Sequence, residues 1–297
     1  MMKRFIVSLL YLLIRYCGVA SLFRTFIAKR KLTVLVYHNP LLDVFEKHVN
    51  YLSSRYNLIS LNDFLDAKSN SSRGKIPDYA LAITFDDGWK ENYELLPIFQ
   101  KYNFRPTLFL TSQVINTERH FWWTYCCNGD VERFKRMPNK QRIAELEEKY
   151  RYDQDKEYKG DRQALNITEI ERMKDFVDFG LHTRYHPVLT QCTMEEKRDE
   201  IMAGKLELEE ILGRRIGAFA YPNGDYDEEC IHILRECGLR IARTTDAGWN
   251  DINSNSYKLK VTGASDNGSI TKLVAELTGI PRFSQHLLYS GHINGKK

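Results

Sequence analysis

The sequence is poor in cysteine, has almost no net charge, and lacks an uninterrupted apolar segment long enough to span a membrane. Its six cysteines include no Cys-x-x-Cys pair, which argues against a disulfide scaffold and a cysteine-based metal site. The 43 basic and 39 acidic residues give a formal net charge of +4, and no basic stripe indicates a nucleic acid partner. With 43% hydrophobic and 28% charged residues among 297, the composition is that of a globular protein with a large core.

The most apolar part of the chain is its N-terminal segment, residues 5–28. Arg15 interrupts this segment near its middle, and a central arginine costs about 2.5–3.5 kcal/mol on insertion scales, which disfavours a membrane span. Basic residues precede the segment at 3–4 and follow it at 29–31. The combination favours a helix that lies in the membrane interface, with its basic side chains reaching anionic head groups.

Three other interpretations of this segment stay open. Residues 18–20 would be the cleavage site of a secretory signal peptide, although Arg15-Tyr16-Cys17 is a poor approach to one. A membrane span and a helix packed on the protein are the remaining two. We therefore expect residues 1–30 to form a membrane-associating segment, on a side of the membrane that the sequence leaves open.

From residue 31 onward, short apolar runs alternate with segments of helical spacing. The runs typical of strands are 33–37, 58–60, 80–85, 106–110, 176–181, 218–221, 239–243 and 259–261. The segments typical of helices are 43–54, 61–67, 92–102, 194–212, 227–237 and 270–277. Repeated strand-then-helix units indicate parallel strands with right-handed crossovers. About seven or eight such strands predict a closed or nearly closed β/α barrel, and a doubly wound open sheet is the alternative.

One stretch, residues 113–165, is far longer than an ordinary connection, and we interpret it as an insertion on the loop face of the barrel. It holds an aromatic run at 120–125 and a charged run of helical character at 139–158. Within the aromatic run, Trp122 and Trp123 can form a platform on which sugar rings stack, or they can bury the insertion against the barrel.

Polar residues gather where the predicted strands end. They are Asp86-Asp87-Gly88, His182-Thr183-Arg184-Tyr185-His186-Pro187, Tyr221-Pro222-Asn223-Gly224 and Thr245-Asp246. In a β/α barrel the carboxyl ends of the strands share one face, and that face hosts the active site. The sequence therefore predicts that these residues converge.

The histidines of this set suit a metal site. His182 and His186 are four residues apart, but Gly180 before them and Pro187 after them disfavour a helix, so we expect a compact turn. Two histidines and a carboxylate, for which Asp87 is our candidate, leave positions on a divalent ion open to water and substrate. The adjacent carboxylate, Asp86, would accept a proton from a water molecule beside that ion.

These segments resemble the signature motifs of the polysaccharide deacetylases, the NodB-homology family. The Thr84-Phe85-Asp86-Asp87-Gly88 and His182-to-Pro187 segments are similar to the first two motifs, and residues 219–224 are similar to the third. The opening at 36–38 and the unit at 45–65 resemble the branch that processes bacterial exopolysaccharide glucosamine. The resemblance covers about residues 32–262, and it implies a deformed (β/α) barrel in which residues 31–297 form one deacetylase domain.

The resemblance also implies an activity, the metal-dependent hydrolysis of N-acetyl groups on an amino-sugar polysaccharide or glycan precursor. Asp86 would be the general base, and Asp87, His182 and His186 would bind zinc or a similar divalent ion. The residues expected to contact the sugar are Tyr221, Pro222, Asn223, Asp246, Trp122 and Trp123.

Two features depart from the family pattern. The third motif often carries an arginine that orients the base, and Ala220 stands at that place. The motif that supplies a histidine as general acid is not recognisable at 259–264. We assign this role to His38, with His292 as the second candidate and a neutral supporting histidine as the alternative for His38. Asp246 would orient a neighbouring side chain or cap a turn.

Two other functions fit the same motifs. A sugar-binding barrel would have lost catalysis, but the retained Asp86 argues against it because a lectin needs no base beside the metal. An O-acetyl esterase or a cyclic-imide hydrolase would use the same site, since esters and amides pass through similar tetrahedral intermediates.

Overall fold

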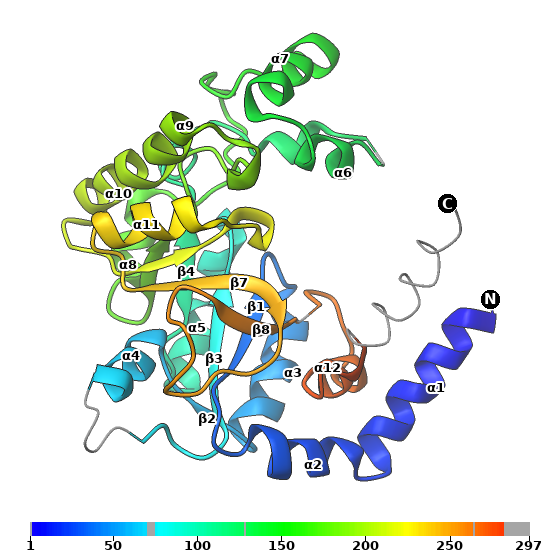
Figure 1. Cartoon of the computed structure of the whole chain (residues 1–297). Coiled ribbons are helices and arrows are strands. Elements are labelled where there is room, and N and C mark those ends of the chain that lie inside the picture. The colour runs from blue at the N-terminus through cyan, green and yellow to red at the C-terminus, as the bar shows by residue number, and fades with distance from the viewer. Residues whose placement is uncertain (1, 70–74, 128, 264, 282–297) are drawn as a thin grey trace, which may run out of the picture. The chain divides into compact units, whose positions relative to one another are not determined.

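A computed structural model describes residues 2–69, 75–127, 129–263 and 265–281 (Figure 1). The strands are β1 Thr33–Tyr37, β2 Asn57–Leu58, β3 Ala80–Phe85, β4 Thr107–Leu110, β5 Asp178–Leu181, β6 Ala218–Ala220, β7 Ile241–Ala247 and β8 Leu259–Gly263. Their order in the sheet is β1-β8-β7-β6-β5-β4-β3-β2, and β1 also pairs with β3, so the strands other than β2 close into a ring. The predicted β/α barrel is confirmed, and the open-sheet alternative is wrong.

Four of the strands are mostly apolar because both of their faces are covered. Every residue of β1, β3, β4 and β6 is buried. Strands buried on both faces are typical of parallel sheets that carry helices outside. This is why continuous apolar runs, and not alternating ones, predicted these strands.

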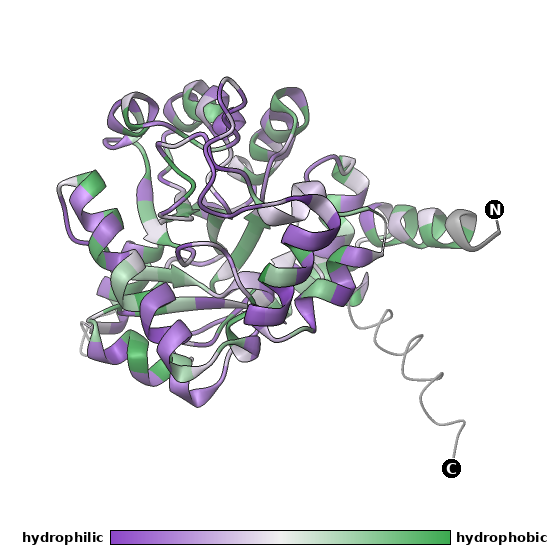
Figure 2. Cartoon of the chain, turned by 90° about the horizontal axis from the view of Figure 1, so that it is seen from above, coloured by the Kyte–Doolittle hydropathy of each residue, from purple (hydrophilic) through white to green (hydrophobic). Residues whose placement is uncertain are grey.

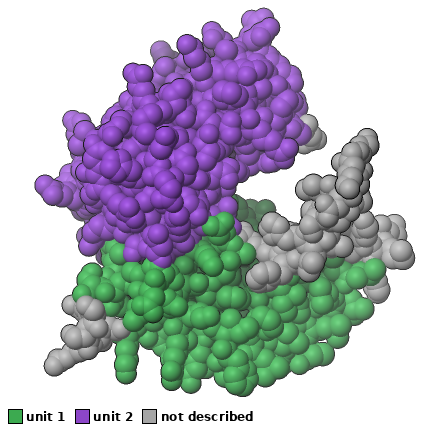
Figure 3. All heavy atoms as spheres, in the orientation of Figure 1, with its two compact units in different colours: residues 1–83, 246–254, 260–297 green, residues 84–245, 255–259 purple. Residues whose placement is uncertain are grey.

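The chain divides into two compact units, which Figure 3 distinguishes by colour. Unit 1 comprises residues 1–83, 246–254 and 260–297, and unit 2 comprises residues 84–245 and 255–259. The helices of unit 1 are α1 Met2–Tyr16, α2 Val19–Phe23, the π-helix η1 Arg24–Ala28, α3 Leu42–Ser53, α4 Leu61–Ser69 and α12 Ile270–Glu276.

The N-terminal helices of unit 1 pack on α12 through a narrow stripe. Ile14 is buried in this contact, and Tyr11 and Arg15, one turn before it and directly after it, are half-buried. Arg15 Nη1 donates a hydrogen bond to Thr271 Oγ1 of α12 at 2.7 Å. Within the described residues no single helix has the length and apolarity to cross a membrane, whereas the segments 6–16 and 19–28 meet that test only together, across a 61° bend.

Unit 2 contains the larger set of helices. They are η2 Lys90–Leu95, α5 Leu96–Lys101, η3 Trp122–Tyr125, α6 Asp130–Lys135, α7 Asn139–Tyr150, α8 Ile167–Met173, η4 Leu189–Gln191, α9 Met194–Arg198, η5 Asp199–Ala203, α10 Gly204–Leu212, η6 Pro222–Gly224 and α11 Glu228–Glu236. The helix predicted at 92–102 is split, because Pro97 lacks an N–H and therefore lies in the first turn of a new helix, α5. The helix predicted at 194–212 is interrupted by one π-helical stretch, η5.

The long segment 113–165 has a small core of its own. Trp122, Phe134, Leu146 and Tyr152 are buried together, and less buried apolar residues pack around them. The helix predicted over 139–158 ends at Tyr150, so the prediction was wrong for residues 151–158. Arg151 adopts a positive φ of 53°, which ends the helix in the left-handed conformation.

Candidate active site

Two carboxylates stand in a tight turn directly after β3. The N–H of Gly88 donates to the carbonyl of Asp86 at 2.9 Å, and Asp87 and Gly88 have φ values of 72° and 81°. A Cβ at Gly88 would lie 2.6 Å from Leu110 Cδ2, so only glycine fits there. The turn places two adjacent, buried carboxylates at the carboxyl end of a central strand.

His182 and His186 follow β5 in a turn and not in a helix, as predicted. Thr183 and His186 have positive φ values of 66° and 58°. Thr183 Oγ1 accepts the N–H of His186 at 3.0 Å, which closes the turn. The same carboxylate oxygen of Glu200, in η5, accepts the backbone N–H groups of Arg184 at 2.8 Å and of Tyr185 at 3.0 Å.

The structure brings Asp87, His182 and His186 together. The two Nε2 atoms are 3.1 Å apart, and each lies 3.6 Å from Asp87 Oδ1. One ligand atom from each of the three residues lies within 4.8 Å of the other two. Two nitrogen ligands on a tetrahedral zinc ion are separated by about 3.3 Å, given bonds of about 2.0–2.1 Å. The donor set therefore fits one divalent cation.

Neighbouring groups orient these donors toward a common point. His182 Nδ1 lies 2.8 Å from the carbonyl of Ala220, which places the proton on Nδ1 and leaves a lone pair on Nε2. Burial is the main cause that lowers the pKa of His182, so its imidazole is neutral at neutral pH, as a metal ligand must be. Trp89, which the sequence analysis did not single out, donates its indole N–H to Asp87 Oδ2 at 2.9 Å, and Asp87 Oδ1 is the oxygen that faces the histidines.

The other carboxylate, Asp86, is held by an arginine that the sequence analysis missed. Arg243 of β7 is 1% exposed, and its Nη2 donates to both oxygens of Asp86. Asp86 Oδ2 lies 3.9 Å from His182 Nε2, directly beside the candidate ligands. The signal available in the sequence was an arginine that ends the predicted apolar run 239–243, because a buried guanidinium needs an acidic partner.

The third motif presents only one of its three predicted sugar-contacting side chains to solvent. Tyr221 is buried, its hydroxyl donates to the carbonyl of Tyr257 at 3.1 Å, and its burial raises its pKa. Pro222 is buried as well, whereas Asn223 is exposed with a φ of 59°. The side chain of Asn223 is therefore the one available for substrate contact in this motif.

The two tryptophans of the insertion differ in accessibility. Trp122 is 2% exposed and lies in the small core, with the Arg142 guanidinium 4.9 Å from the centre of its ring. It buries the insertion, which was the alternative to a sugar platform, and its indole N–H donates to the carbonyl of His186 at 3.0 Å. Trp123 is half-buried, and its ring lies 4.4 Å from that of His186. Of these two tryptophans, Trp123 is therefore the one that offers a ring surface beside His186.

The remaining predicted residues are His38, Asp246 and His292. His38 and Asp246 belong to unit 1, and both are exposed. The backbone N–H of His38 donates to Asp266 Oδ1 at 3.0 Å. His292 lies outside the described residues. The roles of these three residues stay predictions.

Sequence and structure comparisons identify similar proteins. A sequence model of the family described as "Polysaccharide deacetylase" matches residues 73–242. The protein YxkH of Bacillus subtilis (strain 168) is 22% identical over 245 residues, which are 77% of this chain and 70% of that protein.

Two solved structures share the fold. The Streptococcus pyogenes deacetylase PplD in complex with acetate has a TM-score of 0.61 at 19% identity, covering 84% of this chain and 99% of that chain. A de-N-acetylase from Aggregatibacter actinomycetemcomitans has a TM-score of 0.59 at 14% identity, covering 83% of this chain and 99% of that chain.

Proposed function

The chain belongs to the polysaccharide deacetylase family, and from this premise we propose that it is a divalent-metal-dependent hydrolase of N-acetyl groups on an amino-sugar glycan. The observation that carries the proposal is the convergence of Asp87, His182 and His186, with the carboxylate of Asp86 directly beside them. A binding protein would need no buried carboxylate held by an arginine next to the ligand set.

Asp87, His182 and His186 would hold the ion, and zinc suits a set of two nitrogens and one carboxylate oxygen. When bound, such an ion supplies Lewis acidity to the acetyl carbonyl and lowers the pKa of a neighbouring water. Trp89 and the carbonyl of Ala220 fix the orientation of two of these ligands.

Asp86 would act as the general base. Arg243 donates to both of its oxygens, which stabilises the ionised form that can accept a proton. Asp86 takes a proton from water as the water oxygen bonds to the acetyl carbon. The C–N bond then breaks, acetate leaves, and the amine takes up a proton, for which His38 is our proposed donor.

The substrate would be an N-acetylated amino sugar in a polymer or a glycan precursor. Trp123, beside the ring of His186, and the exposed Asn223 are our proposed sugar contacts. Similarity to a structure described as a de-N-acetylase and to a deacetylase that holds acetate supports this class of substrate.

The test is mass spectrometry of acetylated glucosamine oligomers after incubation with the full-length protein. We expect the oligomers to lose acetyl groups, a chelator to stop the loss, and added zinc to restore it. An O-acetylated sugar is incubated in parallel. Loss from the ester alone would assign an esterase, and sugar binding without any loss of acetyl mass would contradict the proposal.

A further inference from the structure

The exposed large apolar side chains of unit 1 are concentrated in the N-terminal helices. The exposed large apolar residues there are Ile6, Val7, Leu9, Leu10, Leu12, Leu13, Tyr16, Leu22 and Phe26. Tyr16 is 69% exposed and Phe26 is 79% exposed. Figure 2 shows apolar residues along the N-terminal helix. Water-soluble surfaces rarely carry such a concentration, so this surface is suited to an apolar environment.

The way in which α1 packs explains why this surface stays open. The stripe of Tyr11, Ile14 and Arg15 contacts α12, and it uses only one face of the helix. The remaining apolar residues of α1 are therefore not needed for packing within unit 1. An amphipathic helix of this kind buries its free apolar side at the boundary between head groups and acyl chains.

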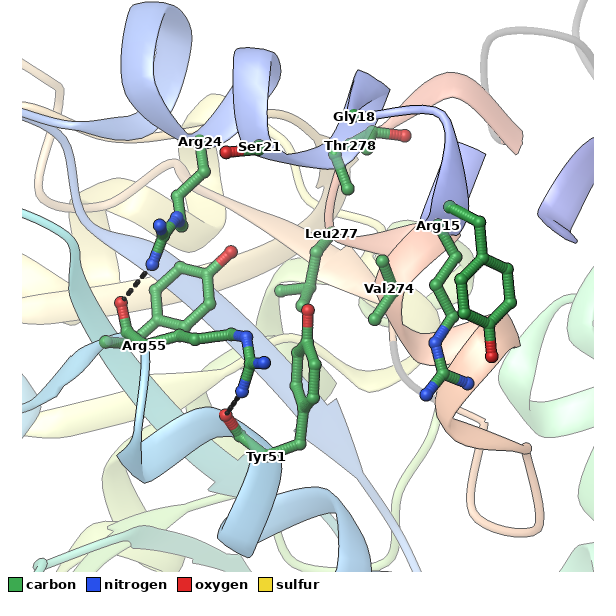
Figure 4. A pocket seen from close by; sticks show the side chains of 12 residues that line it. Arg15, Gly18, Ser21, Arg24, Tyr51, Arg55, Val274, Leu277 and Thr278 are labelled. Carbon is green, nitrogen blue, oxygen red and sulfur yellow. Dashed lines mark hydrogen bonds between the residues drawn. The ribbon is translucent and has the colours of Figure 1, made fainter. Parts of the chain in front are cut away.

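A basic cavity of about 350 Å³ lies next to these helices in unit 1 (Figure 4). Its polar lining comes from Arg15, Ser21, Arg24, Tyr51, Arg55, Tyr56 and Thr278. No acidic residue is among the described residues that line it. Tyr16, which is largely exposed, also lines it, so the cavity is continuous with the apolar surface.

The three guanidinium groups of the cavity bond to neutral oxygens. Arg15 donates to Thr271 Oγ1, Arg24 donates to the carbonyl of Arg55 at 2.9 Å, and Arg55 donates to Ser54 Oγ at 2.7 Å. Across the described part of the chain, none of them forms an ion pair with a carboxylate. In Figure 4, Arg24 points toward Arg55, and the ring of Tyr51 stands between Arg55 and Arg15. Three positive charges around one cavity favour the binding of an anion there.

We infer that this cavity binds the phosphate of an anionic phospholipid while the exposed apolar residues of α1 and α2 enter the membrane surface. Guanidinium groups match the geometry of phosphate oxygens, and tyrosine, serine and threonine hydroxyls can donate to the remaining ones. The apolar residues and the phosphate site lie on adjoining surfaces, as do the acyl chains and the head group of a lipid. The inference is independent of the proposed enzymatic activity.

The test is flotation of the full-length protein with vesicles. One set consists of phosphatidylcholine, and the other contains about one third phosphatidylglycerol. We expect clearly tighter binding to the second set. Arg24→Gln with Arg55→Gln should weaken that binding by at least about tenfold, since each basic residue near an anionic surface contributes about fivefold.

The matched control is Arg30→Gln with Lys31→Gln, which removes the same charge from the same segment outside the cavity. We expect a smaller loss for this control. An equal loss of vesicle binding in both double variants would show that a diffuse basic surface, and not the cavity, recognises the anionic lipid. If the cavity variant does not fold, Arg24→Lys with Arg55→Lys keeps the charge, and it should still lose part of the binding.

Two further results would overturn the inference. Strong binding of inorganic phosphate without any preference for anionic vesicles would make a free phosphate the occupant. Self-association of the protein without vesicles, abolished by Leu9→Ser with Leu13→Ser, would assign the apolar surface to a second copy. None of these measurements uses hydrolysis, so their failure leaves the proposed activity untouched.

Discussion

In most globular proteins polar residues are exposed and large apolar residues are buried, and the two units depart from this rule in opposite ways. In unit 2, Asp86, Asp87, His182 and Arg243 are charged or titratable and are buried. In unit 1, most of the large apolar residues described in α1 and α2 are exposed. A buried polar group and an exposed apolar patch are the two informative departures from globular packing. We propose that something other than the chain itself completes each of these surfaces: a cation in unit 2 and a lipid surface in unit 1.

The largest effect is expected for Asp86→Asn, which tests the role of the buried carboxylate in unit 2. We expect hydrolysis to fall about a thousandfold, because general base catalysis contributes of that order, while metal binding is kept. Turnover and metal content are measured on the same sample. Asp175→Asn, which changes an exposed aspartate of the same unit, serves as the control. Activity near that of the unchanged protein would remove Asp86 as the base.

His182→Ala should reduce metal affinity by more than about a hundredfold, since loss of an outer-shell partner alone costs up to that much. His232→Ala is the matched control, because His232 is a histidine of the same unit whose side chain is 72% exposed. Metal content after dialysis is measured for both. Equal metal content in the two variants would argue against His182 as a ligand.

Arg243→Met should lower the free energy of unfolding by about 3–5 kcal/mol, because it leaves the charge of Asp86 buried without its partner. The double variant with Asp86→Asn removes both charges, so we expect it to regain much of that stability but no hydrolysis. Chemical denaturation and turnover together separate the two roles. A double variant as unstable as the single one would show that Arg243 acts through packing alone.

Glu200→Gln should change how stability depends on pH. Burial raises the pKa of Glu200 from 4.5 to about 7, so its contribution to stability is complete below pH 4.5 and is lost as the pH rises through about 7. Glutamine can accept the same two backbone N–H groups without ionising. Relative to the unchanged protein, the variant should therefore gain about 2–3 kcal/mol between pH 5 and 8. Chemical denaturation of both proteins at pH 5 and at pH 8 measures this gain. The same difference in unfolding free energy between variant and unchanged protein at both pH values would contradict the prediction.

The smallest effect is expected in unit 1. Leu9→Ser with Leu13→Ser should change the free energy of unfolding by no more than about 0.5 kcal/mol per residue, because both side chains are already exposed. Thermal unfolding measures it, and Ile14→Ser in the buried stripe of the same helix is the contrast. A large loss from the exposed pair would mean that these residues are covered by protein.

The sequence predicted the elements whose signal is local. β1 and β3 match their predicted bounds because a continuous buried strand is a run of apolar residues. The ion pair between Asp86 and Arg243 joins residues 157 positions apart, and no local pattern encodes it. The charged run at 139–158 did not reveal where its helix ends, since Arg151 ends it through backbone conformation. An aromatic run likewise does not show which of its rings is covered, as Trp122 demonstrates.

The turn between the two histidines sets a limit for anyone who engineers this protein. Thr183 is β-branched, fully buried and left-handed, a conformation that costs about 1–3 kcal/mol. Glycine would relieve that strain, but it would delete the hydroxyl that accepts the N–H of His186. Relief of backbone strain and loss of that hydrogen bond therefore act in opposite directions at this one residue. The conformation that strains Thr183 is also the one that holds the backbone of His186 in place.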